Sequence, residues 1–408
     1  MFIAIAATMT VILMWSCLSR SMARWKVTAP LAMVVVGALV SWSSDHWLAT
    51  AINTDTAQRI VEFILALFLF TDATEVRDGL SGRRHTGIFR LLFIAFPLSL
   101  AAAYLLGFAL LPGVSWTVLL LIACIVIPID LVPAQAIVRD LRVPERVRHA
   151  LNVESGFNDG LVAPIFLFAL AAAEASVESD QAMHALGQAV PAVVKSVLIG
   201  LSIGAVAGYC MSVAVRKRWT DARAVRIGTI AIPVLTYSVS VWLDGNGFVA
   251  AFLAGIAYST TRRELPGEPL QSTEDVAEFC GLAMWFVVGN VAAASFTWLS
   301  WQVIVYGLLA LTVVRCVPVA ISLLGSPFTQ RERLMLGLLG PRGVASIVFA
   351  LLAFNGLSQD DDAYLVIGVT LVVVVGSVVL HGIGAPVVAE QLGKRRRDKA
   401  IGDKPYSP

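Results

Sequence analysis

Long apolar segments alternate with short charged loops along the whole of this chain. A helix needs about 20 mostly apolar residues to cross the hydrocarbon core of a bilayer. Hydrophobic residues make up 58% of the 408 positions and charged residues only 14%, whereas soluble domains have about 25% charged residues. The sequence therefore predicts an all-α polytopic membrane protein with little mass outside the bilayer.

Thirteen of these segments are candidate transmembrane helices. They cover roughly residues 2–19, 28–43, 58–76, 87–111, 115–138, 149–175, 187–214, 223–243, 246–259, 275–297, 301–324, 333–354 and 362–391. The eighth and ninth are separated only by Asp244-Gly-Asn-Gly247, which is a typical tight turn. We therefore expect about 13 transmembrane helices in a single transmembrane domain over residues 1–393, followed by a basic tail over residues 394–408.

The loops between these segments alternate in charge. Loops after the odd-numbered segments are basic, with Arg20, Arg216 and Lys394 as examples, and the other loops are mainly acidic, with Asp45 and Asp244 as examples. Basic loops stay on the cytoplasmic side of a membrane. The alternation predicts an odd number of spans in the inner (plasma) membrane, with the N-terminus outside and the C-terminus in the cytoplasm. The basic tail is a topology anchor and a candidate contact for anionic membrane lipid.

The five cysteines do not form a metal-binding or disulfide pattern. None is part of a Cys-x-x-Cys sequence or has a histidine nearby, and most lie in apolar runs. Such cysteines are usually small buried residues. The sequence also has no Gly-x-x-x-x-Gly-Lys loop for nucleotide phosphates, and its basic residues lie in loops between helices. We therefore expect no cofactor, no use of ATP and no nucleic-acid partner.

The sixth segment begins with two acids. Glu154 and Asp159 lie within Asn152-Val-Glu-Ser-Gly-Phe-Asn-Asp-Gly160, directly before a long apolar run. Charged side chains inside a membrane helix are costly and usually mark a functional site that faces the protein interior. The alternative is a capped helix start in solvent, which is disfavoured because the loop alternation places this stretch in the membrane. Ser155 lies four residues before Asp159 and shares its helix face, whereas Glu154 lies about 140° away.

Two apolar segments are interrupted at corresponding positions. Pro128-Ile-Asp-Leu-Val-Pro133 breaks the fifth segment, and Gly340-Pro-Arg-Gly343 breaks the twelfth. If the seventh segment is a linker, these are the fifth helices of two six-helix halves with inverted topology. Interrupted helices at matching positions of two halves indicate a transporter binding site. Proline and glycine are common in membrane helices, but the charge inside each break, on Asp130 and Arg342, favours the site.

These groups together would form a cation site made of oxygen atoms. Free carbonyl groups at the breaks around Ile129, the Ser155 hydroxyl and the Asp159 carboxylate suit a hard monovalent cation, either sodium or, in a looser site, potassium. A carboxylate in a poorly hydrated cavity also holds a proton more readily than one in water. Because a proton and a cation compete for the same acid, the sequence predicts an antiporter that exchanges one for the other by alternating access.

Glu154 is better placed for a structural role than for binding the ion. Arg342 is the only base in the second break, so we expect it to pair with Glu154 and to hold the irregular backbone in place. Asn158 can brace the broken helices through its amide, and it leaves Asp159 as the only acid at this position. A lone acid favours the exchange of one proton for one monovalent cation. Arg315 and His381 are expected to be structural partners for backbone groups or acids.

Some alternatives remain open. Asp72, near the cytoplasmic end of the third segment, either lines an entrance or is an ordinary helix-end acid near Arg77. A sodium-coupled transporter of a small organic solute could use a similar inverted-repeat fold, although it would need a roomier cavity and two sodium sites. An intramembrane hydrolase would need a Ser–His or paired-aspartate arrangement, and Ser155 has no evident histidine partner. We therefore expect no enzymatic activity.

In combination, these motifs resemble the monovalent cation:proton antiporters of the CPA superfamily, in the branch of the NhaP-like sodium/proton antiporters. The stretch from Glu154 to Asp159 looks like the family's Glu-Ser-x-x-Asn-Asp helix. The matching motifs elsewhere are Pro128-Ile-Asp130, Arg142-Val-Pro-Glu-Arg146, Arg315-Cys-Val-Pro-Val319, Gly340-Pro-Arg-Gly-Val-Ala-Ser346 and Leu380-His-Gly382. The resemblance implies a 13-helix fold with a core domain around spans 3–6 and 10–13, a dimerisation domain from the remaining spans, elevator-like movement and a homodimer.

The resemblance also implies a role for each site residue. It puts the cation on Asp159, Ser155 and the backbone around Ile129 and Asp130, with Asp130 compensating helix dipoles. It pairs Glu154 with Arg342, and its Asn158-Asp159 form is similar to the electroneutral branch. One position departs from the family, because Ile129 stands where relatives have a threonine and can offer only its carbonyl oxygen.

Overall fold

The apolar segments fold as α-helices, because a chain in hydrocarbon must satisfy its backbone polar groups internally. The computed structural model describes residues 2–25, 27–43, 55–75, 85–134, 143–174, 179–262, 269–295, 299–357 and 361–402. Within these ranges the secondary structure is helical, with no strand. The end of the interrupted fifth segment with the loop that follows it (residues 135–142) and the end of the basic tail (residues 403–408) lie outside the described residues.

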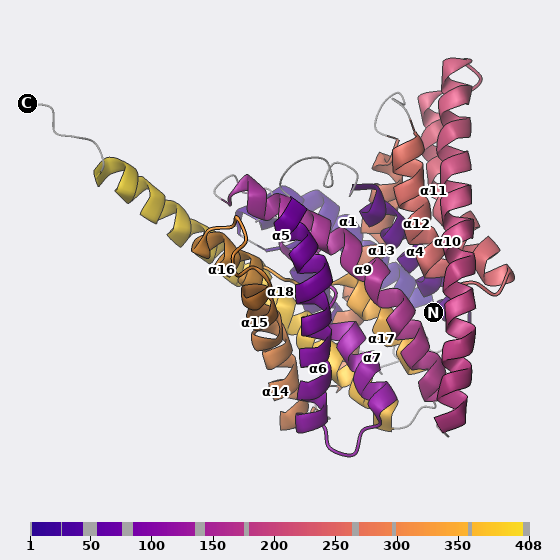
Figure 1. The fold of residues 1–408 in the computed structure, drawn as a ribbon. Coiled ribbons are helices and arrows are strands. Elements are labelled where there is room, and N and C mark those ends of the chain that lie inside the picture. Colours follow the sequence, from indigo (N-terminus) through magenta and orange to yellow (C-terminus); the bar gives the residue numbers. More distant parts are fainter. Residues whose placement is uncertain are drawn as a thin grey trace, which may run out of the picture.

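The helices follow the predicted segments closely (Figure 1). The first part of the chain contains α1 (Phe2–Arg24), α2 (Ala29–Ser43), α4 (Asp55–Glu75), α5 (His85–Arg90), the π-helical turn η2 (Leu91–Ala95), α6 (Phe96–Leu110), α7 (Trp116–Val126), the 3-10 turn η3 (Val132–Ala134) and α9 (Glu145–Glu174). The rest contains α10 (Ser179–Arg216), α11 (Ala222–Trp242), α12 (Gly247–Thr261), α13 (Gln271–Ser295), α14 (Trp301–Leu311), α15 (Val313–Ser322), α16 (Gln330–Leu338), α17 (Val344–Gly356) and α18 (Asp361–Gly402).

Eight of the described helices are long and apolar enough to cross a membrane, and four more are apolar but only 10–17 residues long. The predicted all-α membrane fold is confirmed, while the number of 13 spans stays a prediction. The last helix, α18, is continuous to Gly402 and carries the start of the basic tail away from the bundle (Figure 1).

Both predicted helix breaks are confirmed. In the first, α7 ends at Val126 and the chain continues without α-helix to η3. In the second, α16 ends at Leu338 and α17 begins at Val344. The two irregular stretches touch, because the backbone N–H of Asp130 donates to the carbonyl oxygen of Pro341 at 2.8 Å. Segments more than 200 residues apart therefore meet inside the bundle.

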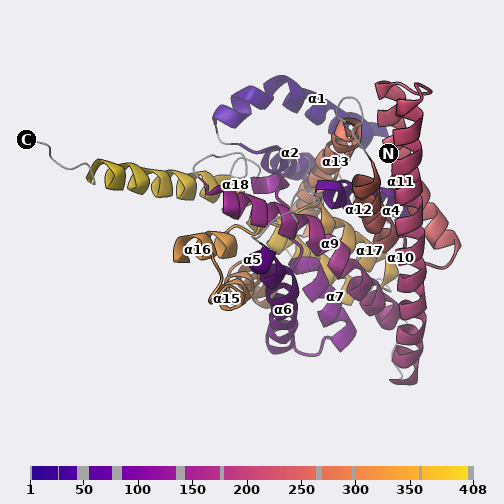
Figure 2. The same ribbon diagram turned by 45° about the horizontal axis from the view of Figure 1, so that its top comes forward.

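The acid-bearing helix α9 lies in the middle of the bundle, in contact with α7, α4, α12 and α17 (Figure 2). Because α7 and α17 are direct neighbours of α9, the acids of α9 can lie beside the polar residues of both breaks. On the flank, α10 packs along α12 through three glycines spaced four residues apart, Gly200, Gly204 and Gly208. An added Cβ at Gly200 or Gly204 would meet the backbone of α12, so these glycines allow the two helices to approach closely.

The outer surface has the distribution of side chains that a bilayer requires. Large apolar side chains on the outer helices are exposed, including Phe108 on α6 and Leu198 on α10. Tryptophans are exposed at helix ends, with Trp219 beside the basic loop after α10 and Trp242 at the far end of α11. Because tryptophan prefers the membrane–water interface, this distribution is typical of a multi-pass membrane protein.

Candidate cation-binding site

Asp130, in the first break, caps the helix that follows the second break. One oxygen of its carboxylate, Oδ2, accepts the backbone N–H of Val344, the first residue of α17, at 2.9 Å. The other, Oδ1, accepts the backbone N–H of Val132 at 2.8 Å. A carboxylate at a helix N-terminus offsets the positive end of the helix dipole. This geometry agrees with the dipole-compensating role that the resemblance implies for Asp130.

Arg342, in the second break, stabilises the C-terminal end of α7. Its guanidinium donates to the carbonyl oxygens of Ile127 and Pro128, just after α7 ends, the second at 3.2 Å. Its backbone N–H donates to the hydroxyl of Ser377 on α18 at 2.6 Å. A cation at a helix C-terminus offsets the negative end of the dipole and satisfies carbonyls that have no partner in the helix. Each break thus supplies the charge that stabilises a helix end next to the other break.

The predicted ion pair between Glu154 and Arg342 is wrong. The guanidinium of Arg315, on α15, donates to both carboxylate oxygens of Glu154, and its Nη2 lies 2.8 Å from Oε2. Arg315 also donates to the carbonyl oxygen of Leu336 at 3.1 Å. The physical reason is that the Arg342 guanidinium is already held by the carbonyls after α7, so α15 supplies the base for Glu154. The general expectation that Arg315 is a structural partner for an acid is confirmed.

Asp159 has a different environment from Glu154. It is 4% exposed, and its Oδ1 atom has no hydrogen-bond partner among the residues that the structure describes. One turn earlier, the Ser155 hydroxyl donates to the carbonyl oxygen of Ile129 at 3.1 Å. Asp130 is close enough for its carboxylate to interact electrostatically with that of Asp159. The structure therefore brings together the predicted carboxylate, hydroxyl and carbonyl oxygens, and it leaves one buried carboxylate oxygen open to a proton or a cation.

The Ile129 side chain does not take part in this oxygen cluster. It is fully buried and packs in an apolar cluster with Val147 and Leu151. Its carbonyl oxygen accepts the bond from Ser155. Residue 129 therefore contributes its backbone oxygen to the site, as predicted, and no side-chain oxygen of its own.

Two predicted roles stay predictions. Asn158 is buried, but its Oδ1 has no partner in the described part of the chain, so the proposed bracing of the broken helices is not seen there. Asp72 is partly buried near the end of α4, which is compatible with either an entrance or a helix-end role. His381 lies as expected near backbone carbonyls, with Nε2 3.1 Å from the Leu338 oxygen.

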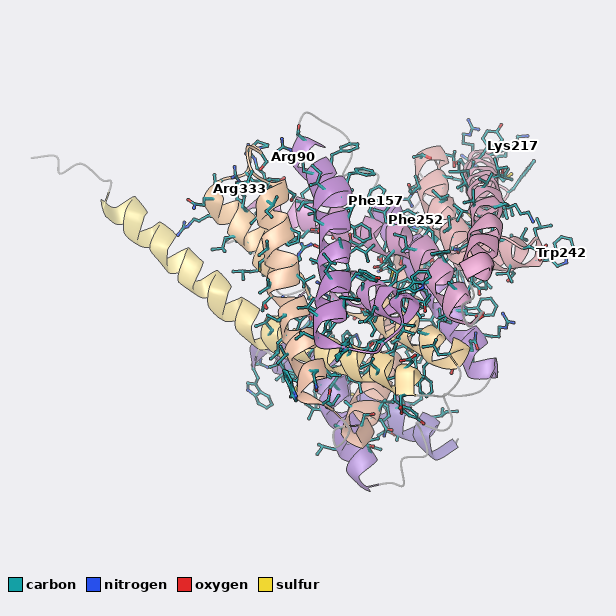
Figure 3. All side chains as sticks on the ribbon, turned by 60° about the horizontal axis from the view of Figure 1, so that its bottom comes forward. Arg90, Phe157, Lys217, Trp242, Phe252 and Arg333 are labelled. Carbon is teal, nitrogen blue, oxygen red and sulfur yellow. The ribbon has the colours of Figure 1, made fainter. Side chains whose placement is uncertain are left out.

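A pair of phenylalanine rings next to Gly160, the residue after Asp159, was not predicted from the sequence. The ring of Phe252 on α12 lies against Gly160, where an added Cβ would be 2.6 Å from the ring. Phe157 meets the same ring edge-on, with centroids 5.8 Å apart (Figure 3). The signal for this contact was the glycine directly after Asp159, because a glycine in a helix next to a functional acid often marks a close approach by a neighbour.

Comparisons with known proteins identify the family of this chain. The chain matches the family described as "Sodium/hydrogen exchanger, transmembrane" over residues 5–391. It is 28% identical over 275 residues to a Na(+)/H(+) antiporter of Schizosaccharomyces pombe, which covers 62% of this chain and 58% of that protein. It is 26% identical over 304 residues to the K(+)/H(+) antiporter NhaP of Alkalimonas amylolytica, which covers 72% and 49%. The aligned part is about half the length of these curated relatives.

The fold is also similar to a solved structure. The sodium proton antiporter MjNhaP1 from Methanocaldococcus jannaschii superposes with a TM-score of 0.74, over 93% of this chain and 99% of that one. The sequence identity is 17%, so this likeness concerns the fold. Since the family match covers nearly the whole chain, the protein belongs to the transmembrane sodium/hydrogen exchanger family.

Proposed function

We propose that this protein exchanges a monovalent cation for a proton across the membrane by alternating access, with Asp159 as the carboxylate that both ions share. One observation carries the proposal. The Oδ1 atom of Asp159 is buried and has no partner among the described residues, and it lies where two interrupted helices meet, one turn from the Ser155 hydroxyl. A buried acid oxygen without a partner is costly, and either a proton or a cation would satisfy it. Membership of the exchanger family supports the same activity.

Sodium is the first candidate cation, with lithium and potassium as the others. The similar proteins include one named as a Na(+)/H(+) antiporter and one named as a K(+)/H(+) antiporter. Carboxylate, hydroxyl and carbonyl oxygens suit each of these hard cations. Asp159 carries the only unpaired acid of the motif, because Glu154 is bound by Arg315 and Asn158 is neutral. This supports an electroneutral exchange of one cation for one proton.

The proposed movement involves two parts of the molecule. A core domain around spans 3–6 and 10–13, which contains the site, would slide against a dimerisation domain formed by the remaining spans in a homodimer. The N-terminus would lie outside the inner (plasma) membrane and the C-terminus in the cytoplasm, in agreement with the alternating loop charges. A protein of this kind would serve pH and sodium homeostasis.

Everted vesicles with a preformed pH gradient test the exchange. A pH-sensitive dye reports whether added sodium, lithium or potassium dissipates the gradient. We expect the wild type to respond to at least one of these ions and Asp159→Asn to respond to none, because the amide can hold neither the proton nor the cation charge. Asp244→Asn is the matched control, since Asp244 is an exposed acid in a turn outside the site.

Two outcomes would contradict the proposal. A wild type that responds to none of the three ions removes the proposed activity. An active Asp159→Asn variant removes the assigned carboxylate while leaving the class of activity in place. Clamping the membrane potential with valinomycin and potassium in proteoliposomes then tests the stoichiometry, because a one-to-one exchange moves no net charge and its rate should not change with the potential.

A further inference from the structure

A buried hydroxyl at the start of α17 has no partner. Ser346 is 1% exposed, and its Oγ has no hydrogen-bond partner among the described residues. It lies two residues after Val344, whose backbone N–H binds the Asp130 carboxylate. A hydroxyl that is buried without a partner costs free energy. An unsatisfied hydroxyl so close to the crossing of the two breaks therefore suggests a ligand that is bound only during part of the transport cycle.

The packing of α17 on α9 shows how far Ser346 lies from Asp159 along the two helices. The ring of Phe349 on α17 lies 4.7 Å from that of Phe166 on α9, centroid to centroid. Seven residues further on, a Cβ added at Gly356 would lie 3.0 Å from the Leu170 side chain, so the two helices run in the same direction. Asp159 lies seven residues before Phe166, and Ser346 lies three before Phe349. The positions of Asp159 and Ser346 are therefore offset by about 6 Å along the helix axes.

The same register shows that both side chains face the contact between α9 and α17. Seven residues are almost two full turns of an α-helix, and α9 continues through Pro164, so Asp159 points to roughly the same side of the helix as Phe166. Three residues are most of one turn, so Ser346 points within about 60° of the direction of Phe349. Phe166 and Phe349 face each other across this contact. Asp159 and Ser346 thus both face the contact between α9 and α17, and Ser346 lies about one turn further toward the C-terminal end of α9.

We propose that Ser346 supplies a hydroxyl oxygen to the transported cation next to Asp159. The inference rests on the proposed exchange activity. An oxygen ligand lies about 2.4 Å from a hard cation, so two oxygens that share one ion lie about 5 Å apart, and the Asp159 and Ser346 side chains would hold the ion between α9 and α17. The Ile129 side chain packs in an apolar cluster and supplies no oxygen, whereas the Ser346 hydroxyl has no partner among the described residues.

Transport kinetics in proteoliposomes test this assignment. We expect Ser346→Ala to raise the apparent KM for the transported cation about tenfold, which corresponds to a lost contact of about 1.4 kcal/mol, while the dependence of the rate on proton concentration changes little. Ser99→Ala is the matched control, because Ser99 on α6 is also a buried serine whose Oγ has no partner in the described chain. It should keep the wild-type KM.

A second pair of variants separates the hydroxyl from its packing. Ser346→Thr and Ser346→Val introduce side chains of the same shape, of which only threonine has a hydroxyl, so threonine should keep a KM much nearer the wild-type value than valine. Equal KM values for these two variants, or a wild-type KM for Ser346→Ala, would overturn the assignment.

Thermal stabilisation by added cation provides a readout that does not depend on exchange. The cation concentration that gives half of the maximal rise in Tm should increase about tenfold in Ser346→Ala and not in Ser99→Ala. If the wild type is stabilised by a cation in this way but does not exchange it, the proposed function fails while the ligand assignment stands. If the wild type exchanges ions and the stabilisation curves of the two alanine variants coincide, the ligand assignment fails alone.

Discussion

At the scale of single residues, the two acids of one helix differ in whether their charge has a partner. Glu154 is 1% exposed and binds Arg315 through both carboxylate oxygens. Asp159, five residues later, keeps an oxygen without a partner in the described chain. An acid held by a bidentate guanidinium is a fixed structural charge, whereas an acid with an open oxygen can take up and release ions. Glu154 is therefore a structural charge, and Asp159 is the acid to which we assign the transported ions.

Removing the base of this pair should destabilise the fold. Arg315→Gln leaves the Glu154 carboxylate buried without its partner, which we expect to lower the free energy of unfolding by about 3–5 kcal/mol. Arg315→Lys keeps the charge but loses the second parallel hydrogen bond, so its loss should be smaller. Unfolding of the purified protein in detergent, followed by intrinsic tryptophan fluorescence, measures both.

Two further variants make this prediction specific. Arg90→Gln is the control, because Arg90 is only partly buried and its guanidinium donates to a backbone carbonyl, that of Leu324, rather than to an acid in the described part of the chain. Its stability should be close to that of the wild type. The double variant Glu154→Gln with Arg315→Gln should recover part of the loss, because no uncompensated charge remains. If Arg315→Gln unfolds like the wild type, Glu154 does not depend on Arg315.

The sequence predicted the separate faces of Glu154 and Asp159 but not which arginine Glu154 binds. The helical angle between the two acids follows from their spacing alone. The choice between Arg315 and Arg342 depends on where carbonyl groups without a helical partner lie in three dimensions. Two such carbonyls, of Ile127 and Pro128, hold Arg342. No pattern along the chain contains that information.

At the scale of the helices, the two breaks act as one unit. Asp130 caps the start of α17, Arg342 binds the carbonyls after α7, and a backbone hydrogen bond from Asp130 to Pro341 joins the two. Helix ends inside a membrane carry unsatisfied polar groups that water cannot reach. Reciprocal capping satisfies these groups with charges from the protein itself, so the open oxygen of Asp159 can lie next to two helix ends inside the bundle.

Gly343 tests how close the breaks must be. An added Cβ at Gly343 would collide with the Asp130 carboxylate, which has no room to retreat while it binds Val344 and Val132. We expect Gly343→Ala to abolish cation-dependent dissipation of the pH gradient and to lower Tm, because it separates Asp130 from the start of α17. Measurements of vesicle exchange and of Tm in detergent check both effects.

Gly187→Ala is the matched control for this substitution. Gly187 lies in α10, and an added Cβ there would have no neighbour within 4 Å. Because alanine also favours helix more than glycine does, the control should keep full exchange and an equal or higher Tm. Full activity of Gly343→Ala would mean that the close contact between the breaks is not needed for transport.

The positions of the breaks were predictable, but their mutual capping was not. Pro128, Pro133 and the Gly340–Gly343 sequence interrupt otherwise apolar segments, and the helices end where these residues indicate. Proline and glycine act locally, so their effect is readable from the chain. The meeting of Asp130 with Val344 joins positions more than 200 residues apart and depends on the packing of the whole bundle.

At the scale of the whole molecule, exposed tryptophans and loop charges bear on how α11 lies in the membrane. The loop after α10 is basic, with Arg216, Lys217 and Arg218, and it also carries the exposed Trp219. At the far end of α11, the turn contains Asp244 and the exposed Trp242. Tryptophans at both ends of α11 match the two membrane interfaces, and the basic loop matches the cytoplasmic side. The sequence predicted this alternation because charge in loops needs no knowledge of the packing.

Labelling of single cysteines can therefore test the orientation directly. In a chain whose five cysteines are replaced, Lys217→Cys and Trp242→Cys introduce exposed thiols at opposite ends of α11 (Figure 3). We expect a membrane-impermeant maleimide to label Trp242→Cys in intact cells and Lys217→Cys only in everted vesicles, because the positive-inside rule puts the basic loop in the cytoplasm. Each variant is the control for the other. Labelling of Lys217→Cys in intact cells would invert the proposed topology, and labelling of both from one side would mean that α11 does not cross the membrane.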